Sequence, residues 1–123
     1  MAIYESGEMY LESILLLSKS KNIVRAIDIC EQLRYSKPSV SRALARLKED
    51  GFILVASSGA ITLTDAGREI AENIYDRHVT LTKALLRLGV SEETATADAC
   101  KIEHDISDES FYLIKKNLSK NEK

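Results

Sequence analysis

Residues 52–64 interrupt a chain whose apolar side chains otherwise recur at helical spacing, and this interruption most limits the possible fold. The runs Phe-Ile-Leu-Val and Ala-Ile-Thr-Leu-Thr flank Ser57-Ser58-Gly59, which predicts a two-stranded hairpin with a short turn. The 123-residue chain has one proline and five glycines, so helix should dominate the rest. Three short helical segments followed by a hairpin predict a winged helix-turn-helix.

The predicted helix boundaries rest on local capping signals. Before the hairpin, helices are expected at about residues 6–18, over Ala26–Leu33, and from Ser36 to Gly51. Ser36 is a candidate N-cap, and Pro38 falls in the first turn, where a missing N–H costs little. After the hairpin, a long helix is expected from a Thr64 cap to Gly89. Ser91 should begin a helix to about Asp105, and Ser107 a last helix to about Leu118.

Charge is unevenly distributed along the chain. The net charge is −2, yet the stretch from Lys19 to Lys48 holds eight cations and two anions. A basic lobe of this kind is typical of phosphate contact, so we expect double-stranded DNA as a partner. The third helix would enter the major groove, where Arg42 could also read guanine. The residues expected at DNA are Arg25, Ser36, Lys37, Pro38, Ser39, Ser41, Arg42 and Arg46. The alternative is a protein-interaction module whose basic face is merely solvated.

The segment Cys100-Lys101-Ile102-Glu103-His104 carries a second kind of chemistry. In a helix, positions i, i+3 and i+4 share one face, so a thiolate, a carboxylate and an imidazole would point the same way. These are ligands for transition metals. One helix cannot enclose a cation, and further candidate ligands are Met9 and Glu12, spaced i and i+3, and His78.

Each candidate ligand also has an ordinary structural interpretation. Cys100 could be a small buried hydrophobe, Met9 a core residue, Glu12 a solvated acid and His78 a hydrogen-bonding residue. Cys30 occupies an apolar helix position without ligand neighbours, so we interpret it as structural.

Taken in order, several motifs resemble the diphtheria-toxin-repressor family of metal-dependent regulators, which includes the manganese transport regulators. They are Glu8-Met9-Tyr10-Leu11, Ser-Lys-Pro-Ser-Val-Ser, Leu63-Thr64-Asp65-Ala66-Gly67, Arg77-His78 and Cys100-Lys101-Ile102-Glu103-His104. The resemblance covers nearly the whole chain. It implies a mainly α fold, with a winged helix-turn-helix DNA-binding domain over residues 1–64 and a helical metal-binding and dimerisation domain over residues 65–123. It further implies a homodimeric repressor that binds a palindromic operator when loaded with metal, which we expect to control metal uptake.

The resemblance also implies how the ligands are shared. Met9, Cys100, Glu103 and His104 match the ligands of one cation, while Glu12 and His78 match those of a neighbouring one. The two sulfur ligands resemble the iron-responsive branch, and Glu12 resembles the manganese branch. Thr82 and Thr96 replace a carboxylate and a histidine of the iron branch's ancillary site. Because thiolate and thioether favour softer metals, we expect Fe²⁺, with Mn²⁺ or Zn²⁺ as alternatives.

Other classes of protein fit less well. The chain has no run of about 18 apolar residues and no signal pattern, so we expect a cytoplasmic protein without a membrane span. It resembles the short family members that lack an SH3-like domain. No His-Glu-x-x-His motif or glycine-rich phosphate loop is present, so we do not expect an enzyme. The competing hypothesis is a winged-helix regulator that responds to a small organic ligand or to oxidation of Cys100.

Overall fold

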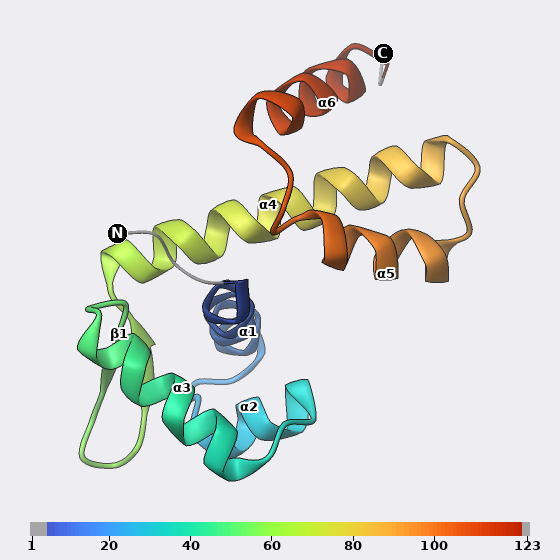
Figure 1. Cartoon of the computed structure of the whole chain (residues 1–123). Helices are drawn as coiled ribbons and strands as arrows, with labels where there is room; N and C mark the ends of the chain where they lie inside the picture. Colours follow the sequence, from blue (N-terminus) through green and yellow to red (C-terminus); the bar gives the residue numbers. More distant parts are fainter. Residues whose placement is uncertain (1–4, 122–123) are drawn as a thin grey trace. The chain divides into compact units, whose positions relative to one another are not determined.

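The computed structural model describes residues 5–121 and confirms a mainly helical fold with one two-stranded sheet (Figure 1). The chain divides into two compact units, Met1–Glu72 and Asn73–Lys123, and the division falls within the long helix α4. Among the described residues, no helix combines the length and apolar character needed to cross a bilayer. The elements in chain order are α1 (Glu5–Ser20), α2 (Ala26–Leu33), α3 (Lys37–Glu49), β1 (Ile53–Val55), β2 (Ile61–Leu63), α4 (Asp65–Arg87), α5 (Glu92–Ile102) and α6 (Asp108–Asn121).

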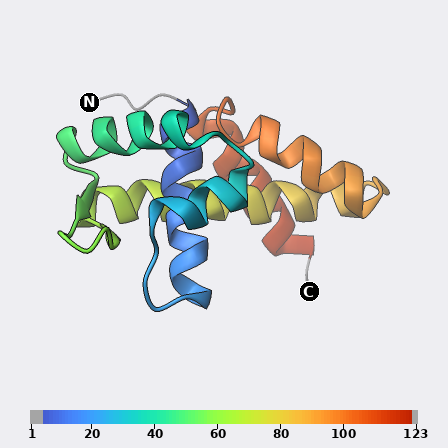
Figure 2. The same cartoon turned by 90° about the horizontal axis from the view of Figure 1, so that it is seen from below.

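The first unit is a winged helix-turn-helix built around α1. This helix runs across α2 and α3 and contacts both of them as well as β2 (Figures 1 and 2). Full burial of one aliphatic side chain contributes about 1.5–3 kcal/mol to folding, so the apolar positions at helical spacing hold the three helices together. The core residues that are at most 1% exposed in this unit are Leu11, Ile14, Ile29, Val40, Leu47, Ile53 and Ala71.

The turn between α2 and α3 follows the predicted capping chemistry. Arg34 ends α2 in the left-handed region, with φ 58°. Ser36 is the N-cap of α3, and its Oγ accepts a hydrogen bond from the backbone N–H of Ser39 at 3.3 Å. Pro38 lies in the first turn of α3, as expected. The buried residues of α3 are Val40, Leu44 and Leu47, so this helix turns its polar residues to solvent.

The predicted hairpin is the wing. Strands β1 and β2 pair antiparallel with Ile53 opposite Leu63, and Gly59 closes the turn with φ +90°. Thr64 then caps α4, because its Oγ1 accepts from the backbone N–H of Gly67 at 3.1 Å. The same hydroxyl donates to the carbonyl of Gly51 at 2.7 Å, which ties the end of α3 to the start of α4.

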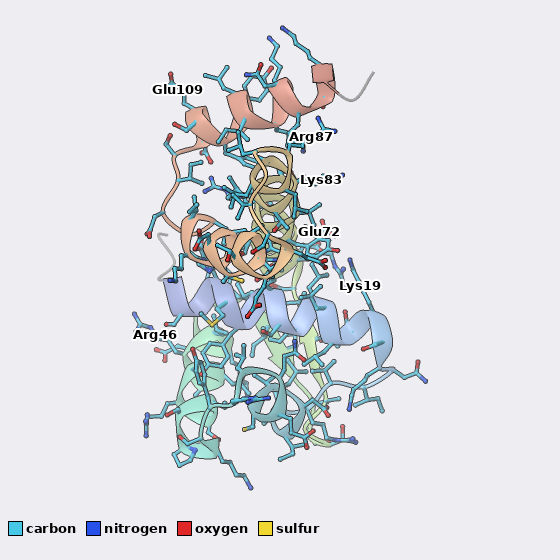
Figure 3. The ribbon with its side chains drawn as sticks, turned by 90° about the vertical axis from the view of Figure 1, so that its right-hand side faces the viewer. Lys19, Arg46, Glu72, Lys83, Arg87 and Glu109 are labelled. Carbon is cyan, nitrogen blue, oxygen red and sulfur yellow. The ribbon has the colours of Figure 1, made fainter. Side chains whose placement is uncertain are left out.

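The second unit contains the rest of α4 together with α5 and α6. Gly89, with φ +99°, follows α4, and Ser91 caps α5 by accepting from the backbone N–H of Thr94. Helix α5 runs back alongside α4, and α6 lies on the other side of α4 (Figures 1 and 3). Helix α5 ends at Ile102, three residues before the predicted end. Arg77 of α4 binds the carbonyls of Glu103 and Ile106 in the turn that follows α5.

Replacing Gly67 by alanine should destabilise the first unit. A Cβ at this position would overlap the carbonyl oxygen of Phe52, a backbone atom that cannot rotate away. Alanine gains about 1 kcal/mol of helix propensity over glycine, but overpacking against a fixed backbone costs about 1–3 kcal/mol. We expect a net loss in the free energy of unfolding, measured by urea denaturation.

The matched control is Ala66→Ser, on the same turn of α4 but exposed. Its effect should stay within about 0.5 kcal/mol, the usual range for surface substitutions. If Gly67→Ala were as stable as the control, the close approach of α4 to Phe52 would not contribute to the free energy of unfolding.

Candidate metal centre and nucleic-acid interface

Three of the six predicted metal ligands lie together in the second unit. The imidazole of His78 comes from α4, the thiol of Cys100 from the last turn of α5, and the carboxylate of Glu103 from the residue that caps α5. His78 Nδ1 lies 2.9 Å from Glu103 Oε1 and 3.8 Å from Cys100 Sγ. All three ligand atoms lie within 4.8 Å of one another. Residues of two consecutive helices, 22 to 25 positions apart in the chain, therefore converge on one small volume.

The spacing of these atoms suits a transition metal. Ligands bound at about 2.0–2.3 Å lie no more than roughly 4.6 Å apart across a single cation. The His78–Cys100 and His78–Glu103 separations fall inside this limit. Nitrogen, sulfur and oxygen donors also match a borderline-soft divalent ion such as Fe²⁺ or Zn²⁺. The residues fit a metal, although three donors leave coordination positions for other ligands.

Burial differs sharply among the three residues. Glu103 is 1% exposed, His78 is half-buried and Cys100 is exposed. Taking a carboxylate out of water costs several kcal/mol unless a cation or hydrogen bonds compensate. The contact with His78 contributes part of that compensation. A divalent ion at this position would add a much larger one, while the exposed thiol leaves the cluster open to solvent.

The other three predicted ligands are each partly buried within their own unit. His104 is half-buried in the turn after α5, directly after Glu103. Met9 and Glu12 are half-buried on α1, in the first unit. Their i and i+3 spacing puts them on one side of that helix, as predicted.

Met9 has a partner that the sequence did not indicate. The hydroxyl of Tyr35 donates to Met9 Sδ at 3.4 Å, and the Tyr35 ring packs at 56° to that of Tyr10 with centroids 6.0 Å apart. Tyr35 directly precedes Ser36, the N-cap of α3. A predicted metal ligand is thus in contact with the turn that starts the DNA-entering helix. Only the aromatic character of Tyr35, in a turn otherwise made of polar residues, could have drawn attention to it.

Helix α3 presents the predicted DNA-binding residues to solvent. Six of them are exposed: Ser36, Lys37, Pro38, Ser41, Arg42 and Arg46. Figure 3 shows Arg46 extending outward from α3. Ser39 is half-buried, and its hydroxyl accepts from Ser36 Oγ at 2.9 Å. Lys37 and Ser41, like Arg42 and Arg46, are four residues apart and so share faces of the helix.

Arg25 lies at the wing rather than on α3. Its Nε donates to the carbonyl of Ser58 at 3.3 Å, so an exposed guanidinium stands beside a hairpin tip that has no cation of its own. Nearby, Lys21 and Asp28 form an ion pair at 2.8 Å. The hydrogen bond from Lys21, with a second one from the backbone N–H of Arg25, lowers the pKa of Asp28. By accepting from the backbone N–H of Arg25, Asp28 helps to cap α2, and its charge neutralises that of Lys21.

A winged helix-turn-helix joined to a helical unit with a nitrogen, sulfur and oxygen cluster defines a metal-responsive DNA-binding protein. Comparison with known families gives the same class. The N-terminal DNA binding domain of the iron dependent repressors matches residues 2–61, and their metal binding and dimerisation domain matches residues 64–123. The chain therefore belongs to the iron-dependent repressor family of metal-dependent transcriptional regulators.

Individual relatives agree with this assignment. The chain is 34% identical over 113 residues to an uncharacterised HTH-type transcriptional regulator of Methanocaldococcus jannaschii, covering 90% of both chains. It is 34% identical over 102 residues to the transcriptional regulator MntR of Geobacillus kaustophilus, covering 83% of this chain and 72% of that one. It is 33% identical over 109 residues to the diphtheria toxin repressor of Corynebacterium diphtheriae, covering 87% of this chain and 48% of that one.

Solved structures show the same fold. The manganese regulator SloR matches with a TM-score of 0.82 and 25% identity, over 97% of this chain and 55% of that one. A manganese-dependent transcriptional repressor in complex with manganese matches with a TM-score of 0.85 and 29% identity, over 92% of this chain and 52% of that one. The chain thus spans about half the length of these two proteins and of the diphtheria toxin repressor.

Proposed function

We propose that this protein is a repressor whose homodimer binds a palindromic operator when a divalent transition metal occupies the cluster of His78, Cys100 and Glu103. The observation that carries the proposal is the convergence of these three ligand atoms within 4.8 Å. Met9, Glu12 and His104 are proposed as further ligands, on the strength of the family resemblance. The family assigns DNA binding to the first domain, and metal binding and dimerisation to the second.

Metal binding and DNA binding would be coupled because one cation would be bound by residues of both units. A cation held by residues of the helical unit and by Met9 and Glu12 would restrain the winged helix relative to that unit. Two winged helices held at one spacing match two half-sites of a palindrome. Thermodynamic coupling is reciprocal, so DNA should tighten metal binding as much as metal tightens DNA binding, typically by about 5–150-fold.

We propose Fe²⁺ as the physiological metal, because the Cys100 thiolate and the Met9 thioether favour softer ions over Mn²⁺. Zn²⁺ could bind more tightly in a purified system, since affinity rises along the first-row series independently of which metal a cell supplies.

We also place the functional boundary between the two domains at residues 64 and 65. The part of α4 up to Glu72 nevertheless belongs to the compact N-terminal unit, and Gly67 in this part lies close to the backbone of Phe52.

Replacing Cys100 by alanine tests the metal site. Co²⁺ bound to a thiolate has an intense charge-transfer absorption in the near ultraviolet, and that band should be lost in Cys100→Ala. We expect metal affinity to fall by at least about tenfold, comparable with the loss of one ligand-supporting interaction. Cys30→Ala is the matched control, because Cys30 is half-buried on α2 in the other unit. An unchanged Co²⁺ spectrum in Cys100→Ala would refute the site.

The same proteins separate metal activation from the competing redox hypothesis. Operator binding should weaken when a chelator removes the metal under reducing conditions. A regulator controlled by oxidation of the exposed Cys100 would instead bind DNA in chelator and release it only when the thiol is oxidised.

Arg42→Ala should weaken DNA binding and lower its salt dependence. Arg42 is exposed on α3, and one lost phosphate contact reduces the slope of log K against log salt by about one. Lys116→Ala removes the same charge from an exposed position on α6 and serves as the control. Fluorescence anisotropy at several salt concentrations measures both. Equal slopes for the two variants would remove Arg42 from the interface.

A further inference from the structure

A buried arginine lies next to the candidate metal centre. Arg77 is 8% exposed and directly precedes His78 on α4. Its Nη1 donates to the carbonyl oxygens of Glu103 at 3.2 Å and of Ile106 at 2.7 Å, and its Nη2 donates to the carboxylate of Asp108. The guanidinium also lies 5.4 Å from the centre of the Phe111 ring. One side chain of α4 therefore holds the whole turn between α5 and α6.

The planar guanidinium suits this task. A buried cation is costly unless its N–H groups are paired, and the two carbonyls and the carboxylate supply acceptors for Nη1 and Nη2 in different directions. The carbonyls of Glu103 and Ile106 belong to the turn between α5 and α6, where backbone groups need hydrogen-bond partners from outside the helices. Arg77 supplies these partners and thereby holds Glu103 against α4.

Glu103 is consequently held at two points by neighbouring residues of α4. Its carbonyl accepts from Arg77, while its carboxylate meets His78 Nδ1 at 2.9 Å. Cys100 lies one turn earlier on α5, so its Sγ is carried to within 3.8 Å of the same nitrogen. Main-chain anchoring by Arg77 and side-chain contact by His78 together set the distance between the two helices at the cluster.

We propose that Arg77 is the positioning residue of the metal centre: it sets the separation of Glu103 and Cys100 from His78 by holding the turn after α5. This inference rests on the proposed metal site. Arg77 itself is no ligand, because a guanidinium is a cation that carries donors only. Residues that hydrogen-bond to metal ligands and orient them typically raise metal affinity, and their removal lowers it by about 10–100-fold.

Arg77→Lys is the informative variant, since it keeps the charge but loses the planar fork that reaches three acceptors. We expect Co²⁺ affinity to fall by about 10–100-fold, together with a weaker thiolate-to-Co²⁺ absorption. In the presence of chelator, the NMR signals of the His78 ring should also shift, which reports on the contact with Glu103 independently of metal.

Arg87→Lys is the matched control. Arg87 also extends from α4 toward α6, and its Nη1 donates to the carbonyl of Leu118 at 3.2 Å (Figure 3). It holds the far end of α6 rather than the turn at the cluster. Its replacement should leave the Co²⁺ spectrum, the affinity and the His78 signals unchanged.

The outcomes are distinguishable. If Cys100→Ala binds Co²⁺ like the wild type, the proposed metal site is wrong. If Cys100→Ala loses the band while Arg77→Lys keeps wild-type affinity and spectrum, the site stands and the positioning role is refuted, even if Arg77→Lys unfolds more easily. If Arg77→Lys does not fold, Asp108→Asn replaces it, because Asp108 is 94% exposed and its loss only weakens the hold on the guanidinium. A several-fold fall in affinity then supports the role, and an unchanged affinity refutes it.

Discussion

The buried carboxylate of Glu103 is the group on which the C-terminal unit depends most. It is 1% exposed, and a carboxylate removed from water must be compensated by hydrogen bonds or by a cation. His78 meets this carboxylate, and Arg77 holds the carbonyl of the same residue, so two successive positions of α4 hold Glu103 in place. The imidazole of His78 thus lies between this acid and the thiol of Cys100, and the carboxylate would offer a divalent ion a full opposite charge.

The N-terminal unit relies on a different device, the capping of helices by hydroxyl groups. Ser36 satisfies the start of α3, while Thr64 connects the end of α3 to the start of α4. These short contacts leave the cations Lys37, Arg42 and Arg46 exposed on a helix whose apolar face is buried. Phosphate contacts from such a surface position the helix, and base contacts by one or two side chains specify the sequence.

The family places DNA binding and metal binding in separate domains, so the proposed coupling would have to pass through residues that link the two functions. Tyr35 would be such a residue if Met9 is a ligand as proposed, because its hydroxyl contacts Met9 and its backbone leads into the cap of α3. A thioether that gives electron density to a cation is a weaker hydrogen-bond acceptor. Metal binding by Met9 would therefore loosen the contact with Tyr35 and be felt at the start of the DNA-entering helix.

The amino-acid sequence by itself determined the elements whose signals are local. The caps Ser36, Thr64 and Ser91 and the helical periods depend on residues within four positions of one another, and the hairpin pairs residues at most ten positions apart; all are found as predicted. Tertiary structure alone decided the contacts of Tyr35 and Arg77 and the convergence of His78, Cys100 and Glu103. His78 meets Cys100 and Glu103 across 22 and 25 residues of chain, and such a meeting is governed by how two helices pack, which no local pattern encodes.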